Sequence, residues 1–369
     1  MPVKVIELLP DLGVGGAERL VLDICRTLDR ERYDVTLVSL FSQANAAPLS
    51  RAVCEQAGLR CVFLDKQPGL DLKLLGRLTT LYRQVRPDVV HSHLYAGVYS
   101  LWAARRAGVP VSVHTVHTLA DKEMPSLHKR CMRHAYRAGR VAPVAISPQV
   151  QQSLYREYGL PADRVVCIDN GIDIARFTPP AAGLAHDGFR FISVGRLCEA
   201  KNQHLLIEAF AQVHRQLPDA TLTIVGEGPL RAALEQQVAQ AGLSDCVSLP
   251  GISDDVPGYL HRSDVFVFSS DYEGVGLVLM EAMAAGLPVV STAAGGVANV
   301  VTDGQNGFLT PVGDATALAA CMTRLASDDT LRGQMAAAAR KRAVGFDIGA
   351  MTRQYAALFD ELLAKQAKK

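Results

Sequence analysis

The sequence lacks several features that mark particular classes of protein. Its eight cysteines form no Cys-x-x-Cys pair or other metal-binding spacing, which is typical of reduced thiols in a cytosolic protein rather than of a disulfide framework. No apolar run approaches the ~20 residues that a membrane span requires. The first apolar stretch, Val3–Leu9, contains Lys4 and Glu7, and these charges exclude a secretory signal. We therefore expect a cytoplasmic protein.

A large excess of either charge is also missing. The net charge is +1 over 369 residues. Residues 1–180 contain 23 Lys and Arg against 17 Asp and Glu, whereas residues 181–369 contain 15 against 20. The basic first half suggests contact with an anionic surface or substrate, although an asymmetry of this size is also compatible with chance. We expect no nucleic-acid partner.

Short β-branched runs alternate with longer amphipathic runs, which predicts parallel sheets covered by helices on both faces. The chain is too long for one ordinary core, so we expect two such domains. The expected strands are Val3–Leu9, Asp34–Ser39, Cys61–Leu64, Val89–His91, Val111–Thr115, Val144–Ile146, Phe189–Val194, Ala220–Val225, Val247–Leu249, Val265–Ser269, Pro288–Ser291 and Gly307–Leu309. The expected helices between them are Ala17–Leu28, Leu70–Gln84, Tyr95–Ala107, Pro148–Tyr158, Gln203–Leu217 and Pro229–Ala241.

The pattern of strands and helices restarts in the second half of the chain. The Pro-, Gly- and Ala-rich stretch 177–188 is the best linker candidate. We expect an N-terminal domain over 1–180, a C-terminal domain over 181–345 and a terminal helical segment over 346–369. Ligands of parallel sheets bind at the carboxyl ends of the strands, so a cleft between the two domains is the natural site.

The most informative stretch is Glu273-Gly-Val-Gly-Leu-Val-Leu-Met-Glu281, which follows an apolar run. A strand, a Gly-containing turn and a helix N-terminus together offer free backbone N–H groups to an anion. A carboxylate at each end can accept hydrogen bonds from the hydroxyls of a ligand. Phosphate held by N–H groups and sugar held by carboxylates suggest a site for a nucleotide sugar.

Two other loops follow expected strands and precede expected helices. In Asp11-Leu-Gly-Val-Gly-Gly-Ala-Glu18, Gly15 and Gly16 let the backbone approach a diphosphate, although a plain tight turn explains the glycines as well. In the loop after Val194, Arg196 and Lys201 can both point into a cleft and bind phosphate, although solvated loop charges are the alternative.

The histidines cluster at His91-Ser-His93 and His114-Thr-Val-His117, at the ends of two expected strands. Four histidines could bind a metal, but this spacing lacks helical or carboxylate support, and we predict no metal site. Hydrogen bonding of strand-end histidines to substrate hydroxyls is the preferred interpretation, and buried, hydrogen-bonded histidines are the alternative.

A basic amphipathic segment spans residues 127–140. Its apolar positions are Leu127, Cys131, Met132, Ala135 and Tyr136, and its cations are Lys129, Arg130, Arg133, Arg137 and Arg140. The segment could lie on anionic lipid headgroups at the inner face of the cytoplasmic membrane. A core-packed helix with a solvated basic face is the alternative.

Taken together, the motifs resemble those of the family-4 retaining glycosyltransferases, and the resemblance covers essentially the whole chain. The matching residues are Gly15-Gly-Ala-Glu18, His117, Ser193-Val-Gly-Arg-Leu197, Lys201-Asn202, Gly226-Glu-Gly-Pro229 and the pair Glu273 and Glu281. The resemblance implies the GT-B fold, an α/β architecture of two Rossmann-like parallel-sheet domains that face each other across a cleft. It also implies a last helix that crosses back to the first domain.

The family's residue roles carry over by position. The resemblance implies that Arg196 and Lys201 bind the donor diphosphate, that Glu281 holds the ribose and Glu273 the transferred sugar, and that His117 lies near that sugar. Backbone N–H groups from Gly15, Gly16, Gly274, Val275, Gly276 and Leu277 complete the cradle. The base pocket comprises Val225–Gly228, with Gly226 and Gly228, and 251–254, with Ile252. Catalytic importance is expected for Glu273, His117, Arg196 and Lys201.

Two departures refine these expectations. Val275 stands where Phe is common, which could reshape the sugar pocket. No Asp-x-Asp motif is present, so we expect metal-independent transfer in which Arg196, Lys201 and helix dipoles stabilise the leaving diphosphate. A retaining glycosidase uses two carboxylates about 5 Å apart, one as nucleophile. The glutamates here are expected to bind hydroxyls instead, so we expect front-side attack by the acceptor with retention.

The expected function is transfer of a sugar from a nucleotide-diphosphate sugar to a hydroxyl of a glycan or lipid-linked acceptor, as in bacterial polysaccharide or glycolipid synthesis. No cofactor is expected, and a UDP-sugar is favoured over a GDP-sugar as co-substrate. A nucleotide-sugar 2-epimerase on the same fold and a non-catalytic sugar-binding subunit are the alternatives. A nicotinamide dehydrogenase is weaker, because the first loop lacks the glycine fingerprint.

Overall fold

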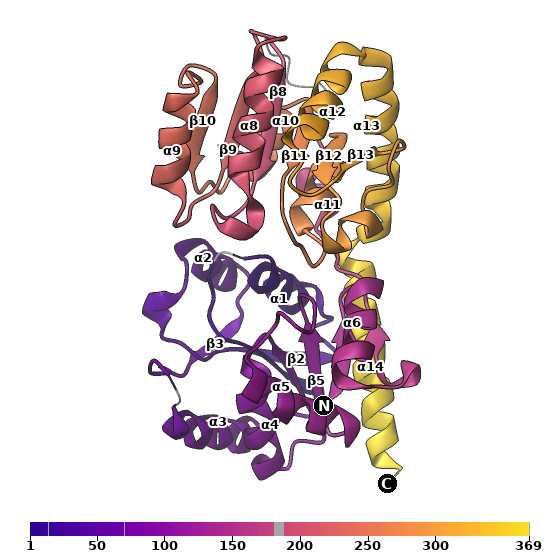
Figure 1. Cartoon of the computed structure of the whole chain (residues 1–369). Coiled ribbons are helices and arrows are strands. Elements are labelled where there is room, and N and C mark those ends of the chain that lie inside the picture. Colours follow the sequence, from indigo (N-terminus) through magenta and orange to yellow (C-terminus); the bar gives the residue numbers. More distant parts are fainter. Residues whose placement is uncertain (14, 70, 181–187, 369) are drawn as a thin grey trace. The chain divides into compact units, whose positions relative to one another are not determined.

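The structure, a computed structural model, describes residues 1–13, 15–69, 71–180 and 188–368. The chain divides into two compact units, unit 1 (Met1–Gly171 and Ile348–Lys369) and unit 2 (Ile172–Asp347). Figure 1 labels their elements. The sequence placed the boundaries at 180/181 and 345/346, and the acceptor and donor roles of the two domains stay predictions, as does the cleft between them.

Unit 1 contains a parallel sheet with the strand order β3-β2-β1-β4-β5-β6-β7. Its strands are β1 (Val3–Leu9), β2 (Tyr33–Ser39), β3 (Arg60–Phe63), β4 (Val89–His93), β5 (Val111–Val116), β6 (Ala142–Ala145) and β7 (Val166–Cys167). Its helices are α1 (Gly16–Thr27), α2 (Pro48–Gln56), α3 (Leu72–Val85), α4 (Ala96–Ala107), α5 (Ser126–Arg137), α6 (Pro148–Tyr158) and α14 (Ile348–Ala367).

Unit 2 repeats this plan with the order β10-β9-β8-β11-β12-β13, and its strands are also parallel. Its strands are β8 (Arg190–Val194), β9 (Thr221–Val225), β10 (Val247–Gly251), β11 (Val265–Phe268), β12 (Val289–Thr292) and β13 (Gly307–Thr310). Its helices are α7 (Ile174–Phe177), α8 (Gln203–His214), α9 (Arg231–Gln240), α10 (Val256–His261), α11 (Leu277–Ala284), α12 (Ala315–Ser327) and α13 (Asp329–Ala343). Both sheets have the Rossmann order, so the predicted fold class is confirmed at the level of each unit.

The sheet of unit 1 buries both faces, because its strands alternate between two helical layers. Ile6 and Leu8 of β1 pack into a core with residues of α3 and α4. Leu9 packs with Val21 of α1 on the opposite face. Glu7 shares that second face by the period-two geometry of a strand, so a charged side chain enters a fully buried layer.

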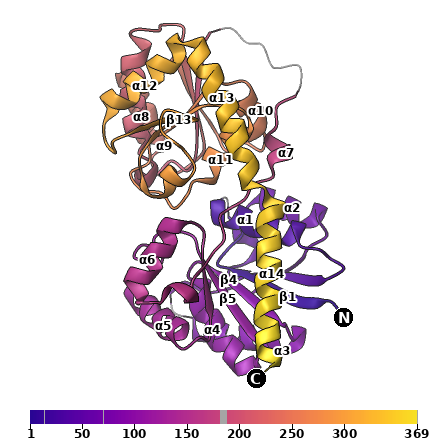
Figure 2. The same ribbon diagram turned by 90° about the vertical axis from the view of Figure 1, so that its right-hand side faces the viewer.

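The last helix, α14, packs on the α1 face of unit 1, and Figure 2 shows it running along the sheet. Thr352 Oγ1 lies 2.7 Å from Thr27 Oγ1, and the Tyr33 hydroxyl donates to Asp360 Oδ1 at 2.9 Å. Tyr355 and Phe359 are fully buried. The terminal helix therefore completes the core of unit 1 although it follows unit 2 in the sequence.

Two expectations about side chains and segments are wrong. Phe177, the first residue of the predicted linker, is fully buried as the last residue of α7, a helix of unit 2 that packs against α11. Linker residues 181–187 lie outside the described residues. Leu127, expected on the apolar face of α5, is 69 % exposed, whereas Met132, Ala135 and Tyr136 are buried as predicted. Leu127 lies in the first turn, where the helix has not yet reached its core contact.

Candidate donor and histidine sites

The predicted donor-binding residues of unit 2 lie in loops that leave the carboxyl ends of parallel strands. These loops therefore meet at one edge of the sheet. The loop after β8 carries Arg196 and Lys201, the loop after β9 carries Gly226 and Gly228, the residue after β10 is Ile252, and the loop after β11 carries Glu273, Gly274, Val275 and Gly276 and leads into α11 at Leu277.

The loop after β8 presents both predicted cations. Arg196 is exposed, and the side chain of Lys201 is 23 % exposed. Lys201 ends a single 3₁₀ turn, and Asn202 then adopts a left-handed φ of 45°. The Asn202 side chain accepts a hydrogen bond from Leu205 N at 3.2 Å and thereby caps α8. This cap fixes the start of α8 directly after Asn202, and it therefore also holds the backbone of Lys201, the residue before it.

Lys201 and Glu273 form an ion pair through Nζ and Oε2. Lys201 Nζ also lies 4.7 Å from the centre of the Phe268 ring, a cation–π distance. Glu273 Oε1 accepts a hydrogen bond from Gly274 N at 3.2 Å. The sequence assigned this cation to phosphate and this carboxylate to sugar. Their charged atoms are in contact, so the two predicted subsites are neighbours within unit 2.

Helix α11 starts directly after the loop of Glu273. Gly276 precedes it with a φ of 76°, a conformation that favours glycine. The predicted cradle 274–277 thus ends at a helix N-terminus, where free N–H groups attract anions. Val275 is 3 % exposed, so this loop offers its backbone rather than that side chain. Glu281, in the second turn of α11, is 5 % exposed.

The glycines of these loops permit close backbone contacts. A Cβ on Gly226, whose φ is 149°, would lie 1.9 Å from Gly195 O, and a Cβ on Gly296 would lie 1.7 Å from Gly274 O. Both distances are shorter than any real contact of this kind, so only glycine fits. The loop after β9 therefore packs directly on the cation loop, and the loop after β12 packs directly on the Glu273 loop.

The predicted base pocket lies beside the cation loop. Gly226 N donates to Gly251 O at 2.9 Å, which brings the end of β9 against the end of β10. Ile252, the next residue, is 57 % exposed. An exposed apolar side chain at this edge is available to contact a flat base.

In unit 1, the predicted phosphate loop precedes α1. Gly15 is the N-cap of α1, and Gly15 and Gly16 are exposed. The Glu18 carboxylate folds back over this terminus, since a Cβ on Gly15 would lie 2.2 Å from Glu18 Oε2. A negative side chain thus lies near the N-terminus of the helix, where the helix dipole favours it. Val14 lies outside the described residues.

The four histidines of unit 1 have different environments. His91, His93 and His114 are fully buried, which agrees with the alternative of buried, hydrogen-bonded histidines. His117, just after β5, is partly exposed. Burial lowers the pKa of His91 and of His117 to about 3, helped in both by the nearby His114, so both rings are neutral at pH 7. Only His117 among these four can reach a ligand.

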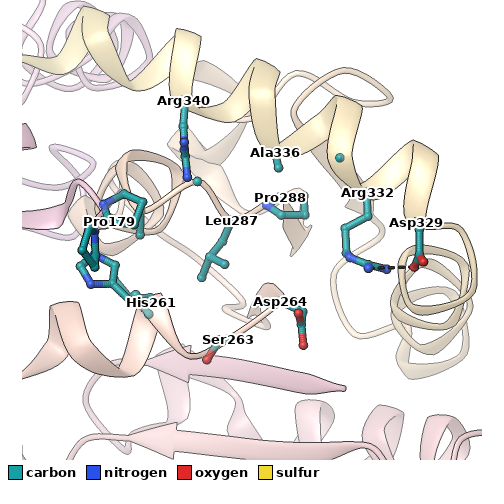
Figure 3. A pocket seen from close by; sticks show the side chains of 15 residues that line it. Pro179, His261, Ser263, Asp264, Leu287, Pro288, Asp329, Arg332, Ala336 and Arg340 are labelled. Atoms are coloured by element: carbon teal, nitrogen blue, oxygen red, sulfur yellow. Dashed lines mark ion pairs between the residues drawn. The ribbon is translucent and has the colours of Figure 1, made fainter. Parts of the chain in front are cut away.

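Figure 3 shows a hollow of about 360 Å³ in unit 2, and none of the predicted donor-binding residues is among those that line it. It is lined by Asp264, immediately before β11, and by Pro288, immediately before β12. It is therefore at the amino ends of the strands, opposite to the edge where ligands of such sheets bind. The Arg332 guanidinium at its rim pairs with Asp329 at 2.8 Å.

Sequence reasoning missed three features of these sites. Asn202 Nδ2 donates to Asp271 Oδ1 at 2.8 Å and links the loops after β8 and β11. The pair Gly295 and Gly296 packs against the Glu273 loop. Glu7 makes hydrogen bonds in the histidine cluster. The last had a signal in the sequence, because a carboxylate inside the apolar run Val3–Leu9 has to find a buried partner.

Comparison with known families divides the chain in the same way. Residues 14–176 match the family model described as "Glycosyltransferase Family 4", and residues 176–342 match "Glycosyl transferases group 1". The chain is 34% identical over 72% of its length to a D-inositol 3-phosphate glycosyltransferase of Frankia alni, of which it covers 72%.

Two further relatives span nearly the whole chain. One is the UDP-Gal:alpha-D-GlcNAc-diphosphoundecaprenol alpha-1,3-galactosyltransferase of Escherichia coli, 28% identical over 93% of this chain and 92% of that protein. The other is the crystal structure of Anabaena HepE in complex with UDP and glucose, with a TM-score of 0.85 and 25% identity over 97% of this chain and 100% of that one. The chain therefore belongs to the family-4 glycosyltransferases and is a retaining glycosyltransferase of the GT-B class.

Proposed function

We propose that the donor is a UDP-sugar and that the acceptor is a hydroxyl of a lipid-linked or growing glycan in cell-surface polysaccharide or glycolipid synthesis. The observation that carries this proposal is the contact of Lys201 with Glu273 at the carboxyl edge of the unit 2 sheet, with Arg196 exposed in the same loop. The Anabaena structure, solved with UDP and glucose, supports the donor. The Escherichia coli relative, named for a diphosphoundecaprenol-linked acceptor, supports the acceptor.

The unit 2 residues divide the donor among them. Arg196 and Lys201 bind the diphosphate, since a guanidinium fork and an ammonium both suit phosphate oxygens. Glu281 binds the ribose and Glu273 the hydroxyls of the transferred sugar. The exposed Ile252 contacts the base, Gly226 and Gly228 belong to the same base pocket, and the backbone of 274–277 receives phosphate oxygens.

The chemistry follows from this division. The glutamates act as hydroxyl ligands, so no carboxylate attacks the sugar. The acceptor hydroxyl attacks on the face from which the diphosphate departs, and a donor phosphate oxygen takes its proton. Lys201 and Arg196 neutralise charge on the leaving group, and the helix terminus of α11 adds its dipole. The reaction proceeds without a resident metal, and catalysis comes from positioning and charge stabilisation.

The unit 1 residues have smaller roles in this proposal. The exposed backbone of Gly15 and Gly16 approaches the donor, with the Glu18 carboxylate displaced. His117 contacts a hydroxyl of the transferred sugar through its free ring edge, because its other ring nitrogen is already hydrogen-bonded inside unit 1.

A thermal-shift panel of nucleotide diphosphates and nucleotide sugars tests the donor. A ligand present at 100 times its dissociation constant stabilises the folded state by about 2.7 kcal/mol, which is easily measured. We expect UDP and one UDP-sugar to raise the melting temperature more than the GDP compounds. A shift only with GDP compounds contradicts the UDP assignment. A separate incubation of the donor without acceptor tests the epimerase alternative, which predicts an isomerised sugar.

We also propose a weak peripheral contact of α5 with anionic lipid. Leu127 is 69 % exposed, and Arg130 beside it is exposed as well. Several cations of the predicted basic face are engaged inside unit 1, since Lys129 donates to Asp121 O, Arg133 to Glu157 O and Arg137 to Tyr158 O. None of the helices, over the residues described, has the length and apolar character needed to cross a bilayer.

Sedimentation with vesicles tests this contact. We expect the protein to bind vesicles that contain anionic lipid at low salt and to be released by salt, because Debye screening weakens surface electrostatics. A Leu127→Ser, Arg130→Ser double variant is expected to bind less. No binding at low salt contradicts the membrane contact and leaves the transferase assignment untouched.

A further inference from the structure

A chain of buried hydrogen bonds leads from the first strand to the one histidine of its cluster that is partly exposed. Glu7 Oε2 lies 2.8 Å from His93 Nε2, and His93 Nδ1 lies 2.9 Å from His117 Nε2. On its other side, Glu7 Oε1 lies 3.0 Å from His91 Nδ1. The side chains of Glu7, His91 and His93 are fully buried.

The register of the sheet brings these residues together. Glu7 of β1 lies opposite His91 of β4, and His93, two residues on, projects from the same face. His93 lies opposite Thr115 of β5, and His117 is again two residues on. The face is covered by α14, whose Tyr355 hydroxyl lies 3.1 Å from Thr115 Oγ1. The chain of contacts therefore follows from strand order and alternation alone.

The direction of each hydrogen bond follows from the carboxylate. Each Glu7 oxygen faces one ring nitrogen, and when the carboxylate is ionised it only accepts, so that in this state His91 Nδ1 and His93 Nε2 both carry protons. Burial lowers the pKa of His93 well below its usual value, so this ring is neutral and its Nδ1 is bare. His93 Nδ1 then accepts a hydrogen bond from His117 Nε2–H. The remaining nitrogen of His117, Nδ1, is left without a proton.

The second branch agrees with this direction. His91 Nε2, bare for the same reason, lies 2.7 Å from Thr115 Oγ1, which donates to it. Thr115 Oγ1 in turn accepts from the Tyr355 hydroxyl. In this arrangement every protonated ring nitrogen of His91 and His93 faces an acceptor, and every bare ring nitrogen faces a donor.

We propose that Glu7 is a positioning residue that acts through His93 to fix His117 as the Nε2–H tautomer, so that His117 Nδ1 can only accept a hydrogen bond from a substrate hydroxyl. The substrate part rests on the proposed function, in which that hydroxyl belongs to the transferred sugar. Such an acceptor favours a hydroxyl over the negatively charged phosphate oxygens nearby, because two acceptors cannot bond to each other. His117 therefore discriminates the sugar end of the donor from its phosphate end.

A metal ion is the competing explanation of the cluster. Among the described residues, Glu7, His91 and His93 have potential ligand atoms within 4.8 Å of one another. Each of these atoms is, however, at hydrogen-bond distance from another side chain, and a metal requires His91 Nδ1 and His93 Nε2 to lose their protons. The hydrogen-bonded arrangement satisfies the donors and acceptors without that loss.

The first test reads the tautomers directly in the full-length wild-type protein. Long-range ¹H–¹⁵N spectra distinguish a protonated from a bare ring nitrogen, and His117→Gln identifies the signals of His117. We expect a bare Nδ1 and a protonated Nε2 for His117, and no stoichiometric metal by elemental analysis. A His117 with protonated Nδ1, or a bound metal whose removal by chelation shifts His91 and His93, overturns the proposal.

The second test uses variants with a matched control. In Glu7→Gln the amide provides one donor and one acceptor, so one of His91 and His93 must reverse its tautomer. Thr115→Val disturbs the same buried cluster on the branch away from His117 and is expected to leave the His117 tautomer unchanged. Unchanged tautomers in a folded Glu7→Gln, or a reversed His117 in Thr115→Val, overturn the proposal. If Glu7→Gln fails to fold, the wild-type spectrum decides.

The kinetic test separates positioning from a structural role. His93→Leu removes the partner of His117 Nε2, and we expect kcat to fall about tenfold or more, the usual effect of losing one well-placed hydrogen bond, with KM for the donor changed less. Thr115→Val is expected to keep wild-type kcat. An equal loss in both variants overturns the role of His93. Failure of the wild type to transfer any sugar contradicts the proposed function alone, since the tautomer spectra need no substrate.

Discussion

At the scale of single residues, the contact between Lys201 and Glu273 is the centre of the account. Both side chains are about one-fifth exposed, so their pairing contributes at most about 1 kcal/mol to stability. Their proximity therefore has more bearing on ligand binding than on folding. A donor that enters between them gives Lys201 a charged phosphate in place of the carboxylate, and gives Glu273 neutral hydroxyl donors in place of the ammonium.

Glu273→Gln tests this function. We expect the variant to lose nearly all turnover, because an amide donates on the side where the carboxylate accepts from a sugar hydroxyl. The melting temperature without ligand should stay close to that of the wild type. Initial rates with the best donor of the panel provide the measurement, and Glu208→Gln, an exposed change on α8, provides the control. Near-normal transfer by Glu273→Gln removes this residue from the site.

Sequence reasoning at this scale found the exposed charges but not the buried network. Arg196, Lys201 and Glu273 lie in loops next to recognisable strands, so local patterns suffice to place them at one edge of the sheet. Glu7 and His91 are 84 residues apart in the sequence and meet only through the pairing of β1 with β4. No local pattern contains that register. The sequence therefore showed that Glu7 is a charged residue in an apolar run, but not which side chains it hydrogen-bonds.

At the scale of elements, the strands of both sheets could be predicted because buried parallel strands are short β-branched runs. The short edge strand β7 was missed, since two residues carry no period. The core-facing half of α5 was found by its helical spacing, whereas its first turn was misassigned because Leu127 has no core beneath it. Packing of one loop on another, as between the loops after β11 and β12, depends on tertiary distance and leaves only a glycine pair in the sequence.

Gly296→Ala tests that loop packing. Its Cβ would meet Gly274 O at 1.7 Å, so the Glu273 loop has to shift, at a cost of about 1–3 kcal/mol. We expect a lower melting temperature and donor binding weakened at least tenfold, measured by calorimetric titration.

Gly333→Ala serves as the matched control for this loop change. It lies in α13, where an added Cβ meets nothing within 4 Å, and it should stabilise the fold by about 0.5–1 kcal/mol without affecting binding. Equal binding by the wild type and Gly296→Ala would show that the loop contact does not support the donor site.

At the scale of the whole molecule, the buried histidines make stability depend on pH. His91 and His93 keep lowered pKa values in the folded state, mainly because of burial, whereas the unfolded chain has values near 6.5. Below pH 6.5 the unfolded chain therefore binds protons at these rings that the folded state does not bind. The free energy of unfolding consequently falls as the pH falls. For each of these histidines, the free energy of unfolding falls by about 1.4 kcal/mol between pH 7.5 and pH 5.5.

Glu7 opposes this trend, because burial raises its pKa and a folded state that binds the proton first gains stability on acidification. His91, His93 and also His117, whose pKa burial likewise lowers, outweigh one carboxyl, so we expect the melting temperature of the full chain to fall between pH 7.5 and pH 5.5. Differential scanning calorimetry in buffers of equal ionic strength measures it. A melting temperature that is constant or rises over this range contradicts the assignment of neutral, buried histidines.

The proposed function requires that the loops of unit 2 hold the donor. Calorimetric titration of UDP, and then of the best UDP-sugar, into the wild type, Arg196→Ala, Lys201→Ala and the exposed control Lys341→Ala tests this most directly. We predict a dissociation constant at least about tenfold weaker for Arg196→Ala and for Lys201→Ala, since each removes a charged hydrogen bond to phosphate, and no change for Lys341→Ala. Wild-type affinity in both site variants would contradict the account.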